Sequence, residues 1–154
     1  ADAKAARMAA KVERASIKAR KEAIKTIAQL IADAQIVFNA FIRERDKGKG
    51  CFVCGRPFTD KPGQVQHAGH VRSRGAAGHL RFNEDNCHGE CEGCNGPHGA
   101  KPHQIEAGAI ARIGAERYAE LCADNTPHKW QRDELIAIKH EYRAKLKELK
   151  GRTC

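Results

Sequence analysis

The chain has 154 residues and a formal net charge of +9, with 31% of its residues charged and only 5% aromatic. This composition disfavours a large apolar core, and a small core usually needs a further staple such as a metal. No apolar run reaches the roughly 18 residues of a membrane-spanning helix, and no apolar segment with a cleavage-site pattern comes first, so we expect neither a membrane partner nor a secretory signal.

The first part of the chain, residues 1–47, predicts one long basic helix. Residues 3–47 contain neither proline nor glycine and are rich in good helix formers, and Gly48 and Gly50 end the pattern. The first 50 residues carry 12 lysines and arginines against 6 acidic residues, which is most of the excess charge. Such an arm is typical of phosphate-backbone binding, and a solvated helix is the alternative. The expected DNA contacts, including two from the centre of the chain, are Lys18, Arg20, Lys21, Lys25, Arg72 and Arg74.

An apolar stripe with heptad spacing runs along the same helix. Its members recur every seven residues and are Ile17, Ile24, Ile31 and Phe38. Because this spacing is typical of a seam between helices, we expect the stripe to form the interface of a homodimer. The alternative is that the stripe packs only on the C-terminal helices of its own chain.

The central segment, residues 48–104, differs in kind. It holds five of the seven cysteines and six of the eight histidines, together with most of the glycines. Regular structure here must therefore be short. Residues 64–71 predict a strand, residues 71–80 a loop, and residues 80–82 the start of a second strand.

The last segment, residues 105–154, returns to a helical pattern. Residues 105–122 predict a helix that is interrupted or loosened at Gly108 and Gly114. Residues 130–150 predict an amphipathic helix whose apolar face carries Leu135, Ile138, Tyr142 and Leu149.

Two Cys-x2-Cys turns, separated by 36 residues, predict a structural zinc site. A turn of this kind points both sulfurs at one metal, and two turns complete the tetrahedral thiolate set of a structural zinc. Such a site contributes roughly 10–16 kcal/mol of apparent folding free energy, enough to hold a glycine-rich centre together. A pair of disulfides or free thiols is the alternative. The expected ligands are Cys51, Cys54, Cys91 and Cys94.

A second ordered set lies around these turns. His70 is followed by Asn86 after 16 residues, and Asn95 stands directly after the last of the four cysteines. This order resembles the HNH, or ββα-metal, endonucleases, and phage recombination endonuclease VII is similar in plan. The resemblance implies that His70 is the general base, since histidine titrates near working pH, and that Asn86 orients it. It also implies a catalytic magnesium or manganese ion held by His67 and Asn95.

One position departs from the HNH pattern. These enzymes usually carry a carboxylate or a histidine directly before the catalytic histidine, and here that residue is Gly69. His67 would reach the metal only through a kink at Ala68-Gly69, which glycine permits. The reserve ligands are Asp85, His88, His98 and His103.

A longer resemblance covers about three quarters of the chain. Its matching stretches include residues 38–46 (Phe-Asn-Ala-Phe-Ile-Arg-Glu-Arg-Asp), 68–70 (Ala-Gly-His), 80–83 (Leu-Arg-Phe-Asn) and the cysteine turn that ends in Asn95, of which 38–46 and 80–83 are the more specific. In these stretches the chain resembles the NinG (Rap) recombination proteins of lambdoid phages. An Asp that precedes Ala-Gly-His in some relatives corresponds to His67 here. The resemblance implies structure-specific cleavage of Holliday junctions, D-loops and related branched DNA, in the cytoplasm of the bacterial host.

The sequence therefore predicts an α+β protein, with a zinc-stapled ββα-metal centre flanked by a long N-terminal helix and C-terminal helices. The expected function is endonucleolytic hydrolysis of branched DNA during phage recombination. One alternative is a non-catalytic zinc-ribbon DNA-binding protein, which would need the basic helix and the zinc but neither His70 nor Asn95. The other is a duplex-cutting HNH nuclease, although the sequence shows no base-reading module.

Overall fold

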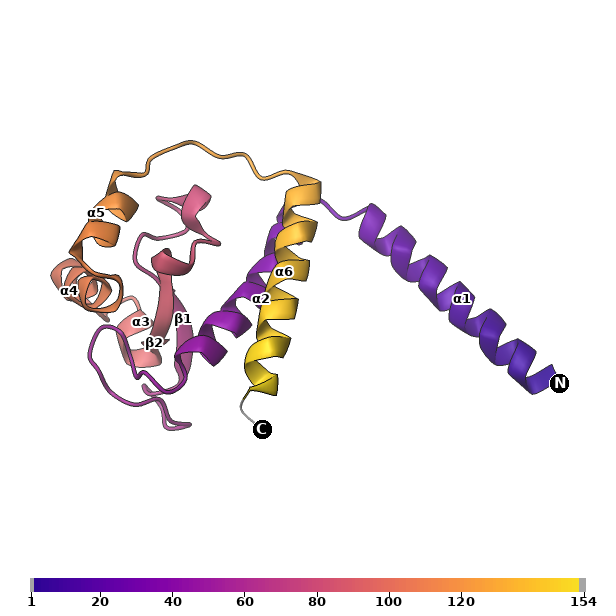
Figure 1. The fold of residues 1–154 in the computed structure, drawn as a ribbon, viewed down its shortest axis with the longest axis horizontal. Coiled ribbons are helices and arrows are strands. Elements are labelled where there is room, and N and C mark those ends of the chain that lie inside the picture. Colours follow the sequence, from indigo (N-terminus) through magenta and orange to yellow (C-terminus); the bar gives the residue numbers. More distant parts are fainter. Residues whose placement is uncertain (1, 153–154) are drawn as a thin grey trace.

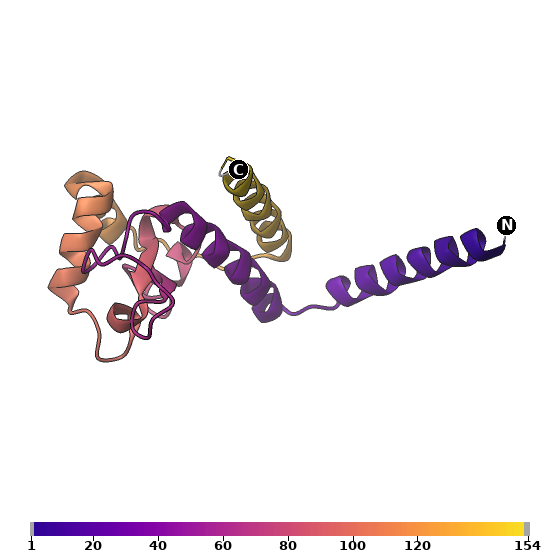
Figure 2. The ribbon, with the colours of Figure 1, turned by 90° about the horizontal axis from the view of Figure 1, so that it is seen from below.

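The computed structural model describes residues 2–152 and has an α+β architecture in which helices surround a two-stranded sheet. In Figures 1 and 2 the first helix projects away from a body formed by all the other elements. None of the helices in this described part is long and apolar enough to cross a membrane. In chain order the elements are α1 (Asp2–Ala23), α2 (Ile27–Asp46), β1 (Gln66–His70), η1 (Gly78–Leu80), η2 (Glu84–Asn86), β2 (Cys87–Cys91), α3 (Glu92–Asn95), α4 (Pro102–Ile113), α5 (Ala115–Ala123) and α6 (Arg132–Gly151).

The N-terminal segment forms two helices, so the prediction of one helix over residues 3–47 is wrong in its middle. The break is a capping box at Thr26, whose backbone is extended (φ −72°, ψ 162°). The Thr26 hydroxyl accepts a hydrogen bond from the Gln29 backbone N–H (3.2 Å), and the Gln29 side chain accepts one from the Thr26 N–H (2.8 Å). Two otherwise unpaired donors are satisfied in this way, which stabilises a new helix start at Ile27.

This break divides the heptad stripe. Phe38 is completely buried, and Ile31 packs on the same core, which also contains Leu135 and Tyr142 of α6. The α2 half of the stripe therefore packs on the C-terminal helix of its own chain, and a continuous seam of all four residues is not available to a second copy. Ile17 and Ile24 remain exposed, at 45% and 80%.

The main core lies between α2 and α6, which run side by side in Figure 1. The Phe38 ring meets Tyr142 edge-on at 4.7 Å and Phe82 at 5.7 Å between ring centroids. The predicted apolar face of α6 is confirmed, because Leu135 and Tyr142 are buried and the other two members pack against the same cluster. Edge-to-face aromatic pairs add about 0.5–1.5 kcal/mol each to the burial of their area.

The strands β1 and β2 pair antiparallel, with His70 opposite Cys87 and His67 opposite Glu90. The prediction of a strand within residues 64–71 is confirmed, but that of a second strand at residues 80–82 is wrong. Leu80 instead ends the 3-10 turn η1 and is buried against Ala77 and Leu121.

The second strand, Cys87-His-Gly-Glu-Cys91, has little intrinsic strand propensity and is held by the end of α2. The Asp46 carboxylate accepts a hydrogen bond from the Gly89 N–H (2.8 Å), and the Arg45 guanidinium donates to the Cys87 carbonyl (2.8 Å). A Cβ at Gly89 would lie 3.0 Å from the Cβ of Asp46. The extended conformation of β2 is therefore set by tertiary contacts rather than by its own residues, as is common for β-structure.

The break in the last segment, residues 105–154, occurs at Gly114, where φ is +85°, and α4 and α5 lie on either side of it. Gly108 does not interrupt α4. It is buried where α4 crosses the Phe52 carbonyl, and a Cβ there would lie 2.2 Å from that oxygen. The predicted loosening at Gly108 is therefore wrong, and this glycine instead permits close packing.

Candidate active site and metal centre

The four cysteines of the two Cys-x2-Cys turns converge on one point. The sulfur atoms of Cys51, Cys54, Cys91 and Cys94 all lie within 4.8 Å of one another. The first turn follows α2 and is closed by a hydrogen bond from the Gly55 N–H to the Cys51 carbonyl (2.9 Å), with Gly55 at φ +72°. The second turn joins the end of β2 to α3. None of the described cysteines forms a disulfide, and four converging sulfurs suit a tetrahedral metal such as zinc.

The electrostatics of this cluster favour a thiolate at one of its members. Burial raises the pKa of Cys54, but hydrogen bonds from the backbone and side chain of Arg56 outweigh it and lower the pKa to about 6. Burial raises the pKa of Cys51 and of Cys94. A bound divalent metal would compensate the thiolate charge that burial otherwise disfavours.

His70 ends β1 and is largely enclosed. Its Nε2 atom lies 3.0 Å from the Arg81 carbonyl oxygen, and its Nδ1 atom lies 3.9 Å from the Cys87 sulfur. Burial lowers the pKa of His70, and the nearby Arg74 and Arg81 add to this effect. The ring is therefore neutral near pH 7. A proton on Nε2 donates to the carbonyl and leaves Nδ1 as the basic nitrogen.

Asn86 is completely buried between the two ends of the loop that follows β1. Its side-chain oxygen accepts a hydrogen bond from the Arg72 N–H (2.8 Å). Its side-chain nitrogen donates to the carbonyls of Arg72 (3.0 Å) and Leu80 (3.2 Å). One side chain thus ties the residues after His70 to the start of β2, and it restrains the loop that carries the Arg81 carbonyl.

His67 and His70 lie on opposite faces of β1. The ladder pairs residues 66–70 with 91–87 one to one, and Gly69 is not among the glycines with positive φ. The kink at Ala68-Gly69 that the sequence allowed is therefore absent. Since side chains alternate along a strand, His67 shares its face with Glu90. Asn95 is exposed at the end of α3.

The four reserve ligands do not form a second cluster. Asp85 is paired with Arg117 through two hydrogen bonds. His88 is buried and its Nε2 lies 2.9 Å from the Asp85 carbonyl, while burial lowers its pKa to about 4. His98 and His103 are exposed. Within residues 2–152, no second set of three His, Cys, Asp or Glu ligand atoms converges as the cysteines do.

Glu90 is a buried acid that the sequence analysis did not single out. It is only 5% exposed, and no hydrogen bond or ion pair within residues 2–152 satisfies its carboxylate. Burial raises its pKa to about 7, and the nearby Cys54 charge adds to this effect. Its Oε2 atom lies 1.9 Å from where a Cβ at Gly69 would be. Only the strand register, which the sequence did not supply, puts these residues together.

The two central arginines expected at DNA have different surroundings. The Arg72 guanidinium donates to the carbonyls of Leu121 (2.9 Å) and Asp124 (2.5 Å) at the end of α5, so its role is to hold that helix. Contact of Arg72 with DNA stays a prediction, made by a guanidinium that already bonds to α5. Arg74 is exposed. The neighbouring Arg81, which the sequence analysis missed, has a buried Nε atom without a hydrogen-bond partner.

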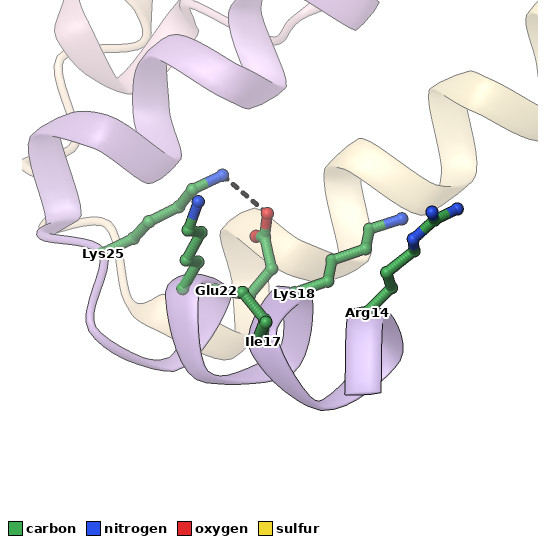
Figure 3. A pocket seen from close by; sticks show the side chains of 6 residues that line it. Arg14, Ile17, Lys18, Glu22 and Lys25 are labelled. Carbon is green, nitrogen blue, oxygen red and sulfur yellow. Dashed lines mark hydrogen bonds and ion pairs between the residues drawn. The ribbon is translucent and has the colours of Figure 1, made fainter. Parts of the chain in front are cut away.

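An open pocket beside α1 is lined by Arg14, Ile17, Lys18, Lys21 and Glu22 of this helix and by Lys25, which follows it (Figure 3). Lys18, Arg20 and Lys21 are exposed and available to an anionic partner. Lys25 differs, because its ammonium group donates to Glu22 (2.7 Å) and Asp33 (2.6 Å) and links the two N-terminal helices. Because the Lys25 ammonium group is paired with these two acids, its role in the fold is to hold the two helices together.

Comparisons with known proteins give one family. A family model described as Bacteriophage Lambda NinG protein matches residues 1–152. The chain is 40% identical over 137 residues to Protein ninG of Escherichia phage lambda, covering 88% of the chain and 64% of that relative. It is 39% identical over 134 residues to Protein ninG of Salmonella phage P22, covering 87% and 64%. The chain thus spans slightly less than two thirds of the length of these relatives. No solved structure is significantly similar to it.

Proposed function

The chain belongs to the NinG family of bacteriophage proteins, and from that premise we propose that it is a metal-dependent HNH endonuclease. Its proposed substrates are Holliday junctions and other branched DNA during phage recombination. The observation that carries the proposal is the setting of His70, a neutral and largely buried imidazole whose Nε2 lies 3.0 Å from the Arg81 carbonyl.

Phosphodiester hydrolysis assigns a task to each of these groups. The basic nitrogen of His70 takes a proton from the attacking water, and the Arg81 carbonyl fixes the tautomer. Asn86 holds the loop and therefore the ring. Arg74 and Arg81 place positive charge beside His70, where a scissile phosphate would be held. Cys51, Cys54, Cys91 and Cys94 would hold a zinc ion, which would tie the hairpin to the segment that follows α2.

A divalent cation, magnesium or manganese, would be held by His67 and Asn95. When bound, it supplies neutralisation of the charge on the phosphate and on the departing oxygen. The register of β1 and β2 puts His67 on the face opposite to His70, so an ion shared with His70 would also need a ligand from another element.

The exposed cations of α1 provide the binding surface for the DNA arms. Lys18, Arg20 and Lys21 lie on a helix that projects from the body, so they can reach phosphates remote from His70 (Figure 2). A Holliday junction is two-fold symmetric and its resolution needs two opposed cuts. A homodimer is therefore the economical assembly, and the exposed Ile17 and Ile24 are its proposed contacts.

The test separates binding from cleavage. His70→Ala should abolish cleavage of a four-way junction while its affinity for the junction stays within about threefold, because a general base acts in the transition state. His128→Ala, which removes an exposed histidine that pairs with Glu134 and contacts the Trp130 ring, is the matched control and should cut normally. A wild-type protein that binds junctions without cutting them would favour the zinc-ribbon alternative.

A further inference from the structure

Helix α1 buries little of its own surface. Residues 3–21 and Ala23 are all exposed, and Glu22 in the last turn is partly buried. An open pocket between α1, α2 and α6 is lined, among others, by Lys18, Leu30 and Ile136. Because α1 has so little apolar packing, the direction in which it projects from the body must be set by other contacts (Figure 2).

Charged side chains at the base of α1 supply such contacts. The Asp33 carboxylate of α2 accepts hydrogen bonds from Lys25, which follows α1 (2.6 Å), and from Lys139 of α6 (2.7 Å). Lys25 also donates to the Glu22 carboxylate (2.7 Å, Figure 3). The hydrogen bonds from Lys139 and Lys25 lower the pKa of Asp33, so the carboxylate is ionised near pH 7. An isolated surface ion pair contributes little to stability, but here one partly buried carboxylate joins cations from two sides.

Arg132, the first residue of α6, adds a second connection to the same place. Its guanidinium donates to the backbone carbonyls of Glu22 (3.4 Å) and Lys25. The last carbonyl groups of a helix have no partner within the helix, so this side chain also caps the end of α1. The end of α1 is therefore bonded both to α2 and to α6, which is more than 100 residues away in the sequence.

We propose that this ionic base holds α1 at a fixed angle to the body, and that the angle makes the protein select branched over linear DNA. The ionic base consists of Glu22, Lys25, Asp33, Arg132 and Lys139. The exposed cations of α1 then meet one duplex arm while the body holds another. A fixed angle keeps this second contact at a high effective concentration on a branched substrate, and a straight duplex does not offer two helices at that angle. The inference rests on the proposed function for its substrate, but not for the fixed angle.

The angle is measured first, without DNA. Spin labels are introduced as unnatural amino acids at the exposed positions Ala10 of α1 and Lys147 of α6, and labelled chains are diluted with unlabelled ones so that double electron–electron resonance reports distances within one chain. The wild type should give one narrow distance distribution. Asp33→Asn keeps the size of the side chain but removes the charge that two ammonium groups share, so it should broaden the distribution, as should Arg132→Gln. The control Asp60→Asn removes an exposed acid between α2 and β1 and should leave the distribution unchanged.

The second measurement compares affinities, with zinc-loaded protein and no other divalent metal. Asp33→Asn should bind a four-way junction about fivefold or more weaker than the wild type, with its affinity for the matched duplex within about twofold, because only the junction engages α1 and the body together. Arg132→Gln provides the same reading should Asp33→Asn fail to fold, as zinc content and melting temperature would show.

Unchanged distance distributions in both variants would overturn the fixed angle. A broader distribution with an unchanged preference for the junction would overturn its role in substrate choice, as would a wild type that binds junction and duplex equally. A wild type that prefers junctions through the ionic base but cuts no DNA would retain this inference and refute the proposed nuclease instead.

Discussion

The side chain of Asn86 provides a quantitative test of how His70 is held. Replacement by alanine removes three hydrogen bonds and leaves the Arg72 N–H and carbonyl without partners, while the Leu80 carbonyl keeps the bond from the Asn83 N–H (3.1 Å). At roughly 1 kcal/mol for each bond, less the solvation that the partly buried Arg72 groups recover, Asn86→Ala should lower the free energy of unfolding by about 2 kcal/mol. Urea denaturation of the zinc-loaded protein measures this value.

The isosteric Asn86→Asp variant sharpens the test. It keeps the acceptor for the Arg72 N–H but places a second oxygen 3.0 and 3.2 Å from two carbonyl oxygens. The pKa of this carboxyl must therefore rise on folding, so its stabilisation is present at low pH and is lost as pH rises through the folded-state pKa. At pH 8 the aspartate variant should be no more stable than Asn86→Ala. The comparison variant Asn83→Ala, an exposed cap of η2, should lose only about 1 kcal/mol. If Asn86→Ala lost less than the about 1 kcal/mol expected for Asn83→Ala, the proposed role of Asn86 in holding the loop would be refuted. An aspartate variant as stable as the wild type at pH 8 would refute it as well.

Four further predictions concern the metal, the base, the arm and the assembly. Purified protein should carry about one zinc per chain, and Cys51→Ser should unfold the centre, as circular dichroism and metal analysis would show. The cleavage rate should rise with pH and level off below the ordinary histidine pKa, because burial lowers the pKa of His70; a rise that continues above pH 8 would exclude this base. The exposed cations of α1 to be changed to glutamine are Lys18, Arg20 and Lys21. The triple variant should bind the junction more weakly, and the slope of log affinity against log salt concentration should fall by up to about 0.9 per lost contact. An unchanged slope would mean that the arm is only a solvated helix face. The exposed isoleucines of the arm are Ile17 and Ile24, and changing both to glutamate should shift sedimentation toward the monomer. A wild-type monomer that makes paired cuts would refute the proposed dimer.

What the sequence could predict depended on how local each signal was. The cysteine turns are local, so spacing alone predicted four ligands that the structure brings together. The helix break at Thr26 was also local, and the pattern Thr-x-x-Gln could have revealed it. The second strand was not, because its backbone is held by Arg45 and Asp46 from α2.

The candidate site shows the same limit more sharply. The pairing of His67 with Glu90, and the carboxylate that occupies the space beside Gly69, depend on a register of two strands far apart in sequence. A one-residue slip would move Glu90 to the other face of the sheet, and no residue type within either strand forbids that slip. The hydrogen bond from Arg72 to the Leu121 carbonyl at the end of α5 also joins residues far apart in the sequence, so the sequence alone could not reveal it.

The most direct test of the proposed function compares two substrates of the same sequence. Zinc-loaded protein with magnesium or manganese is mixed, in single-turnover conditions, with a Holliday junction and with the matched linear duplex. We expect opposed cuts in the junction, leaving 5′-phosphate and 3′-hydroxyl ends, at a rate at least about tenfold above that on the duplex, which is about 1.4 kcal/mol in activation free energy. Equal rates on both substrates would indicate a duplex-cutting nuclease, and an uncut but bound junction would contradict catalysis altogether.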